Sequence, residues 1–315
     1  MANNTLRLTW SKRVVMSKRY WSRPVSWLSS MVLLCAMGIT SEAMAKPDPA
    51  QLLREKYLAL EEPLRQNQFK RQLVLDSAES QGRLRGDIYA VINYPFATVN
   101  AGLNNPQNWC DVMLLHMNTK YCHAAKGASG TVLNVNIGKK TPEDLADAAR
   151  VEFNYSVVAV TPEYFEINLN AREGPLGTSD FLIQLEAVAL PNAKTFLHLT
   201  YSYAINMSGR LSLKAYLGTI GSRKVGFTVI GKKADGQPDY IRGVRGLMER
   251  NTMRYYLAID SFLGATRTAS SGQFEKQIQS WFTATERYPR QLYEMDRRAY
   301  VEMKRAEYVR QQAAY

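Results

Sequence analysis

The chain has little of the chemistry on which most hydrolases and metalloenzymes depend. Its 315 residues include only 3 histidines and 3 cysteines. The histidines are His116, His123 and His198, so few schemes of histidine acid–base catalysis are open to it. No Gly-x-Ser-x-Gly elbow, no glycine-rich phosphate loop before a Lys-Ser/Thr pair and no His-Glu-x-x-His motif occurs. The sequence therefore predicts no motif-defined enzyme, no cofactor and no metal.

The chain also lacks the run of about 20 apolar residues that a transmembrane helix requires. The apolar stretch 27–39 is short, and Glu42 follows it closely. Ala43 and Ala45 then place small residues before Lys46. The stretch is preceded by six basic residues, Arg7, Lys12, Arg13, Lys18, Arg19 and Arg23. This pattern is typical of a secretory signal peptide, residues 1–45, cleaved between Ala45 and Lys46. We expect a periplasmic protein, and N-terminal sequencing of the exported chain tests this expectation.

Alternatives to this leader remain open. A start at Met16 would shorten the basic region to an ordinary length. Cys35 stands where a lipoprotein signal would carry its lipidated cysteine, but Leu34 is too bulky for the position before it. No consecutive arginine pair precedes the apolar stretch, so twin-arginine export has no support.

Removal of Cys35 with the leader leaves Cys110 and Cys122. An even number of cysteines in an oxidising compartment favours one disulfide. A zinc site with His116 and His123 is an alternative, but the spacing matches no familiar zinc motif, and adjacent residues of a strand point to opposite faces. Two free thiols are the third possibility.

The charge is strongly positive. The whole chain carries a formal net charge of +12, and loss of the leader lowers it to about +7. This surplus permits transient contact with an anionic membrane surface or an acidic partner. No module that binds nucleic acid is recognisable, so nucleic acid is not an expected partner.

Hydrophobic periodicity predicts mostly antiparallel strands followed by helices. We expect helices at 48–60, 96–103, 106–117, 209–217 and 238–263, a helical turn at 141–148 and a short extended piece at 73–75. The expected strands are 84–94, 119–125, 131–138, 151–160, 164–171, 181–190, 195–204 and 225–230. Short turns between long strands require antiparallel neighbours. The apolar face of such a sheet needs a partner, and the amphipathic helix 238–263 offers one.

These elements suggest three parts after the leader: a lead-in (46–81), a sheet-and-helix domain (82–264) and a charged helical extension (265–315), with a break at 270–272. The extension is kinked near Pro289 and dense in charge. We expect it to be an appendage, dispensable for folding, that docks a protein partner. Its expected anchors are Trp281, Phe282 and Tyr288.

We expect the charged side chains on strands and helices to be exposed to solvent. Glu152, Glu166 and Glu186 fall on the polar faces of their strands. Glu249 has Arg245 four residues before it, which suggests an ordinary helix ion pair. His198 lies opposite the apolar row of its strand and is expected to be exposed or satisfied structurally.

One strand, two short helices, a run of antiparallel strands and a long helix is an order that resembles the helix-grip fold. START lipid-transfer domains, the birch-pollen allergen family and polyketide cyclases share this fold. The chain is also similar to a START-like family of proteobacterial periplasmic proteins. The resemblance is carried by Pro95-Phe96, Asn108-Trp109-Cys110-Asp111, Gly174-Pro175-Leu176-Gly177-Thr178, Lys224-Val225-Gly226-Phe227, Glu249-Arg250-Asn251-Thr252-Met253-Arg254-Tyr255-Tyr256, Trp281-Phe282 and Glu286-Arg287-Tyr288-Pro289.

The resemblance implies an α+β fold in which a curved antiparallel sheet wraps around the long helix, and a cavity for apolar ligands between them. The expected cavity residues are Met248, Asn251, Tyr255, Phe153, Ile167, Ile183 and Leu199. Asn251 is a polar residue in the apolar stripe, so its amide must find a partner in the protein or in a ligand. The alternative is that both surfaces simply pack together as core.

Three functions follow from this reading. The first is a periplasmic binder or carrier of a lipid or other hydrophobic small molecule. The second is a non-catalytic protein that docks a partner through its C-terminal helices. The third is a cyclase- or hydrolase-like enzyme that uses carboxylates in the cavity.

Overall fold

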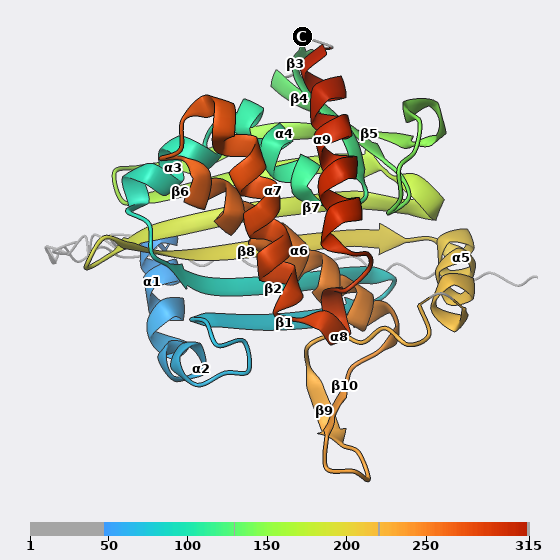
Figure 1. Cartoon of the computed structure of the whole chain (residues 1–315). Coiled ribbons are helices and arrows are strands. Elements are labelled where there is room, and N and C mark those ends of the chain that lie inside the picture. The colour runs from blue at the N-terminus through green and yellow to red at the C-terminus, as the bar shows by residue number, and fades with distance from the viewer. Residues whose placement is uncertain (1–46, 129, 220, 314–315) are drawn as a thin grey trace, which may run out of the picture. The chain divides into compact units, whose positions relative to one another are not determined.

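An eight-stranded antiparallel sheet organises the fold (Figure 1). The computed structural model describes residues 47–128, 130–219 and 221–313. The strand order is β1-β2-β8-β7-β6-β5-β4-β3. The strands are β1 (Leu73–Ser80), β2 (Arg83–Ile92), β3 (Thr119–Gly127), β4 (Gly130–Ile137), β5 (Ala149–Val160), β6 (Tyr164–Glu173), β7 (Thr178–Leu190) and β8 (Lys194–Ile205). The predicted leader and its cleavage site at Ala45 and Lys46 lie outside the described residues and stay a prediction.

Most strands of the sheet form where the sequence alternates, but β1 is an exception, and the strand predicted at 225–230 occupies Val229–Lys232 instead. In β6, buried Phe165, Ile167 and Leu169 alternate with more exposed residues. β1 continues to Ser80, well beyond the extended piece predicted at 73–75. Its second half is polar, and it is a strand because its backbone pairs with β2, for example Asp76 opposite Asp87. Side-chain periodicity carries no signal for such a strand.

Helices cover one face of this sheet, and the result is the predicted helix-grip fold. Figure 1 shows α6, α7 and α9 lying across that face. The helices are α3 (Phe96–Leu103), α4 (Pro106–Leu115), α6 (Gly243–Ala265), α7 (Ser270–Glu286), α8 (Pro289–Leu292) and α9 (Arg297–Ala313). The inward row of the sheet and the buried faces of these helices form one continuous apolar core.

The opposite face of the sheet carries a smaller core beneath α1 (Pro49–Ala59) and α2 (Glu61–Arg65). As predicted, Asp48 caps α1, because its side chain accepts a hydrogen bond from the amide of Ala50. Leu53 of α1 belongs to the same apolar cluster as Val91 and Phe196 of the sheet. The lead-in therefore contributes both a covering helix and the strand β1.

Smaller elements lie at the ends of the sheet. η1 (Leu145–Asp147) replaces the predicted helical turn, η2 (Pro175–Gly177) precedes β7, and α5 (Met207–Gly218) follows β8. Figure 1 shows α5 at one end of the sheet and the β9–β10 hairpin projecting below β1 and α8. The hairpin strands are β9 (Val229–Lys232) and β10 (Pro238–Tyr240). α6 begins at Gly243, later than predicted, because residues 238–240 pair with β9.

The prediction that the C-terminal region is an appendage is wrong. Trp281 and Tyr300 are fully buried, and their rings stack at 4.8 Å. Several of its apolar residues belong to the main core, and Ser270–Gly272 begin α7 rather than marking a break. From Pro47 onward, the described residues form a single compact unit. Within the described residues, none of the helices combines the length and hydropathy needed to cross a membrane.

Candidate functional site

A cavity of about 310 Å³ lies between α6 and one end of the sheet, where α5 and η2 also meet it. Its walls come from segments far apart in the sequence. The described lining residues are His116, Asn118, Thr119, Ile137, Lys140, Pro175, Leu176, Thr178, Phe181, Tyr201, Tyr203, Ile205, Gly209, Leu213, Leu247, Asn251, Arg254 and Tyr255. Most of this surface is aliphatic or aromatic, and the polar groups are few.

The cavity exists because α6 packs tightly against the sheet at Gly86 of β2 but leaves space beside the ends of β7 and β8. A Cβ on Gly86 of β2 would lie 2.2 Å from the hydroxyl of Thr252 and 3.2 Å from Cγ of Met248. Only glycine admits the helix at this distance. Leu247 and Asn251, four residues apart, project from an adjacent stripe of α6 and line the cavity instead.

The structure brings together two of the seven residues predicted for the cavity. Asn251 and Tyr255 line it. Met248 is buried against Gly86 of β2. The predicted sheet residues are also buried in the core, and none of them lines the cavity among the described residues: Phe153, Ile167, Ile183 and Leu199. They lie further along the strands, whereas the cavity is at the strand ends.

Three tyrosines form an aromatic wall of the cavity, and the prediction included only Tyr255. Tyr201 and Tyr203 follow Leu199 on the same alternating row of β8, so the periodicity did place them inward. Their rings lie 5.6 Å apart, and Tyr255 lies 5.1 Å from Tyr201. No hydrogen bond ties any of the three hydroxyl groups to a described residue. Burial raises the pKa of Tyr203 to about 12 and raises that of Tyr201 well above its usual value, so both hydroxyls keep their protons.

His116 adds a fixed donor beside these tyrosines. Its ring stacks on Tyr255 at 5.0 Å, and its Nδ1 accepts a hydrogen bond from the amide of Asn118. Burial, and then the positive charge of Arg254, hold the pKa of His116 well below its usual value. The neutral ring therefore carries its hydrogen on Nε2. That atom is buried without a hydrogen-bond partner among the described residues.

Positive charge collects at the same side of the cavity. Glu294 contacts Lys140 at 2.8 Å, Arg254 at 2.7 Å and Lys224 at 3.3 Å. Burial alone would raise the pKa of Glu294, but the charges of Arg254 and Lys140 lower it to about 2. Burial and Arg254 lower the pKa of Lys140 to about 8. Lys140 and Arg254 both line the cavity.

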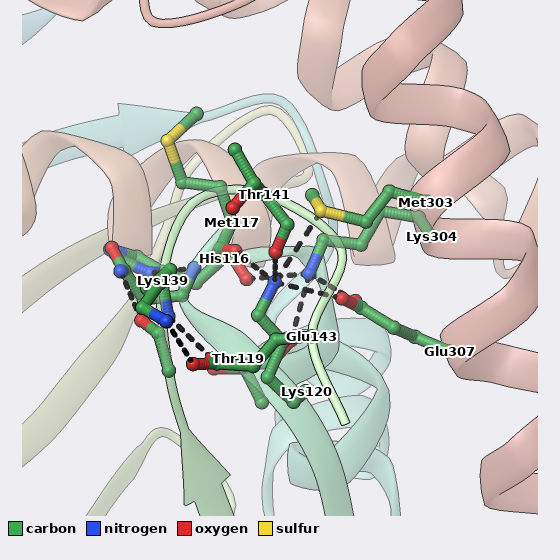
Figure 2. Close-up of polar contacts among 12 residues, drawn as sticks. His116, Met117, Thr119, Lys120, Lys139, Thr141, Glu143, Met303, Lys304 and Glu307 are labelled. Atoms are coloured by element: carbon green, nitrogen blue, oxygen red, sulfur yellow. Dashed lines mark hydrogen bonds and ion pairs between the residues drawn. The ribbon is translucent and has the colours of Figure 1, made fainter. Parts of the chain in front are cut away.

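Behind His116, a fully buried ionic cluster holds α9 against the core. Figure 2 shows Lys120 and Lys304 converging on Glu307. The two Nζ atoms lie 3.0 and 2.6 Å from the carboxylate oxygens of Glu307. Lys304 also donates to the carbonyls of His116 and Thr119, each at 2.8 Å. The cluster thus fixes the backbone that carries His116.

Other buried polar groups correct the expectation of solvated side chains. Glu249 is fully buried and accepts hydrogen bonds from Ser77 and Thr228, both at 2.7 Å, and from the amide of Phe227. It does not form the predicted ion pair with Arg245. Its carboxylate instead ties α6 to β1 and to the chain before β9.

On the opposite face of the sheet, His198 is buried between two carboxylates. Its ring nitrogens lie 2.7 Å from Asp87 and 2.7 Å from Glu186. The imidazole also stacks on Tyr89 at 4.1 Å. The expectation of a satisfied structural histidine is met, but Glu186 and its neighbour Glu166 are bonded within this network rather than solvated. Glu152 is exposed, as predicted.

The predicted disulfide between Cys110 and Cys122 is confirmed. It joins α4 to β3 across a Cα separation of 5.1 Å. Both thiols are thereby consumed, so the alternative zinc site loses its sulfur ligands. Among the described residues, no cluster of His, Cys, Asp or Glu has the size of a metal site.

A second hollow, of about 580 Å³, lies on the surface between the β9–β10 hairpin and α8. Its floor is formed by the mutually packed rings of Phe69, Phe227 and Tyr288. Lys70, Arg287 and Arg290 are among its other lining residues. It is larger, but it is not bounded by the sheet and α6, and more of its wall is polar.

No protein-family model and no curated protein matches the chain. Several solved structures are similar to part of it. A conserved protein from Geobacillus kaustophilus is 12% identical, with a TM-score of 0.32 over 57% of this chain and 95% of its own. An aromatase/cyclase from a Streptomyces species is 12% identical, with a TM-score of 0.34 over 60% of this chain and 98% of its own.

The human StAR-related lipid transfer protein 5 is 11% identical, with a TM-score of 0.27 over 50% of this chain and 81% of its own. At these identities and TM-scores the similarities carry no conclusion about function. The predicted membership of a proteobacterial periplasmic family stays a prediction.

Proposed function

We propose that the protein binds a hydrophobic small molecule or single-chain lipid in the cavity between α6 and the sheet. The observation that carries this proposal is the unfilled volume of about 310 Å³ with predominantly apolar walls. Protein interiors are normally packed to crystal-like density, so an opening of this size at the helix–sheet junction is a feature to be explained. Its volume is within the range of small-molecule sites.

The surroundings of the cavity support uptake of an apolar ligand from outside. Leu176, whose side chain lies at the mouth, is 77% exposed. Leu211 and Met207 of the adjacent helix α5 are 71% and 87% exposed. Large apolar side chains at a rim offer a ligand a continuous path out of water.

The other two functions gain less support. Docking of a partner through the C-terminal helices required those helices to be free, but their anchors Trp281 and Phe282 are buried in the core. An enzyme with carboxylates in the cavity lacks them, because no aspartate or glutamate is among the described lining residues. Binding without chemistry is the simplest use of this geometry.

A blocked cavity tests the proposal. Leu247 of α6 lines the cavity, and Leu247→Trp should fill it. We expect the neutral probe N-phenyl-1-naphthylamine to become more fluorescent when it binds the unmodified protein. The variant should abolish this increase. Because the indole enters empty space, the free energy of unfolding should change by less than about 1 kcal/mol.

The control is Leu58→Trp on α1, where the leucine is 65% exposed and far from the cavity lining. This variant should bind the probe like the unmodified protein. Absence of probe binding to the unmodified protein would refute the proposal. A decrease of about 1–3 kcal/mol in the free energy of unfolding of Leu247→Trp would also refute it, because that is the cost of overpacking a filled core.

A further inference from the structure

We propose that the natural ligand is an amphipathic anion, with a carboxylate or phosphate group held at the Lys140–Arg254 side of the cavity and its apolar chain against the aromatic wall. This inference rests on the proposed function and specifies the chemistry of the ligand. It follows from two independent features of the cavity, the sign of the charged side chains that line it and the kind of hydrogen-bonding groups.

The charged side chains that line the cavity are of one sign. Lys140 and Arg254 line it, and no aspartate or glutamate is among the described lining residues. Arg254 is 1% exposed at the side chain, so water screens its charge poorly. An anionic head group in the cavity would therefore meet cations and no carboxylate of the described wall.

The hydrogen-bonding groups of the cavity also favour an acceptor. His116 carries a buried Nε2–H that no described residue accepts. The hydroxyls of Tyr201, Tyr203 and Tyr255 are protonated and make no hydrogen bond to a described residue. A buried donor such as Nε2–H of His116 normally finds an acceptor. Carboxylate and phosphate oxygens only accept when ionised, and hydrogen bonds to an ionised group are about twice as strong as neutral ones.

The apolar part of the ligand has its own place. Phe181 stacks on Tyr203 at 5.1 Å, and the aliphatic side chains of Ile205, Leu213 and Leu247 line the cavity near them. A ligand with a cationic head would meet Lys140 and Arg254 here, so the same wall disfavours it. The cavity therefore distinguishes ligands with equal chains by the charge of their heads.

Four probes with the same ten-carbon chain test this inference: decanoate, decyl phosphate, decanol and decyltrimethylammonium. Each is used below its micelle concentration to displace N-phenyl-1-naphthylamine from the full chain. We expect decanoate or decyl phosphate to bind at least about tenfold tighter than decanol, and the cation to bind most weakly. Whichever of the two anions binds tighter identifies the acid group as carboxylate or phosphate.

A matched pair of variants identifies the residues responsible. Lys140→Met should weaken the anions by about tenfold and leave decanol unchanged, because one charge-assisted contact is lost. Lys139→Met is the control: this neighbouring lysine is 76% exposed, pairs with Glu143 and is not among the cavity residues. It should leave the affinity of all four probes unchanged.

The outcomes separate the two proposals. If decanol binds as tightly as both anions, or Lys140→Met leaves their affinity unchanged, the anionic head is refuted while a hydrophobic site remains. If none of the four displaces the naphthylamine and that probe itself does not bind, the proposed function fails.

Discussion

At the scale of single residues, the core of the protein contains buried charged groups that contact one another. Lys120 and Lys304 are fully buried, and Glu307 is the carboxylate that both contact. Burial lowers the pKa of Lys304 to about 8, although Glu307 opposes the shift. The ammonium groups are also held by backbone carbonyls, including that of Thr141 at 2.9 Å. Such a cluster is tolerated only when each member keeps its partners.

Removing the shared carboxylate should therefore be costly. Glu307→Gln leaves two buried lysines without a counter-charge, and we expect the free energy of unfolding to fall by about 3–5 kcal/mol. Urea denaturation followed by circular dichroism measures this. The control is Glu302→Gln on the same helix, where an exposed i,i+4 pair with Arg298 is screened by solvent and should contribute little. Equal decreases in the free energy of unfolding of the two variants would show that the buried cluster contributes no more to stability than an exposed ion pair.

His198 gives a second prediction, on pH. Burial alone would lower the pKa of His198, but its hydrogen bonds with Asp87 and Glu186 and their negative charges raise it above its usual value. The folded protein thus binds this proton more tightly than the unfolded chain. The resulting stabilisation is fully present below the unfolded pKa of about 6.5 and is lost as the pH rises through the folded pKa.

Replacement of this histidine should expose that dependence. His198→Gln should lower the free energy of unfolding more at pH 5.5 than at pH 9, because only the protonated imidazole gains from both carboxylates. Denaturant titrations of the unmodified protein and the variant at the two pH values provide the comparison. A cost that is the same at both, or greater at pH 9, would contradict the assignment.

At the scale of elements, one helix serves several neighbours at once. α6 packs on Gly86 with one stripe, faces the cavity with Leu247, Asn251 and Tyr255, and bonds β1 through Glu249. α7 reinforces it, because Nε1 of Trp281 donates to the carbonyl of Arg254 at 3.2 Å. The C-terminal helices are therefore a second layer of the core over α6.

Truncation after Gly272 should accordingly destroy cooperative folding. It removes Trp281 and Tyr300 and leaves Lys120 buried without the carboxylate of Glu307. We expect an aggregating chain or one without a thermal transition, as seen by calorimetry and size-exclusion chromatography. A chain ending at Gln311, which retains the buried part of α9, should fold. A soluble, cooperatively unfolding product from the shorter chain would restore the appendage model.

At the scale of the whole molecule, the cavity belongs to no single part of the chain. Its walls combine the His116 region, β7 and β8, α5 and α6, and its charge depends on Glu294, which follows α8. The Cys110–Cys122 disulfide and the Lys304 contacts to the 116–119 backbone fix one wall from behind. Binding and stability are thus linked through the same C-terminal layer.

The sequence by itself determined the elements and their class. Alternation along β5–β8 identified strands, three- and four-residue spacing identified α6, and the two cysteines that follow the predicted leader indicated the disulfide. These are local signals, because side-chain direction follows the backbone period. The order of elements then predicted the helix-grip fold. The three- and four-residue spacing also singled out Asn251, as a polar residue in the apolar stripe of α6.

Only the tertiary structure decided which charges are buried and where the cavity lies. Lys120 meets Glu307 across 187 residues, and Ser77 meets Glu249 across 172, so no periodicity in either segment indicates the pairing. β1 is a strand through backbone pairing, which leaves no mark on side-chain pattern. The cavity lies at the strand ends because α6 approaches β2 at Gly86 and leaves β7 and β8 uncovered there. Such distances depend on how whole elements pack, and local sequence does not encode them.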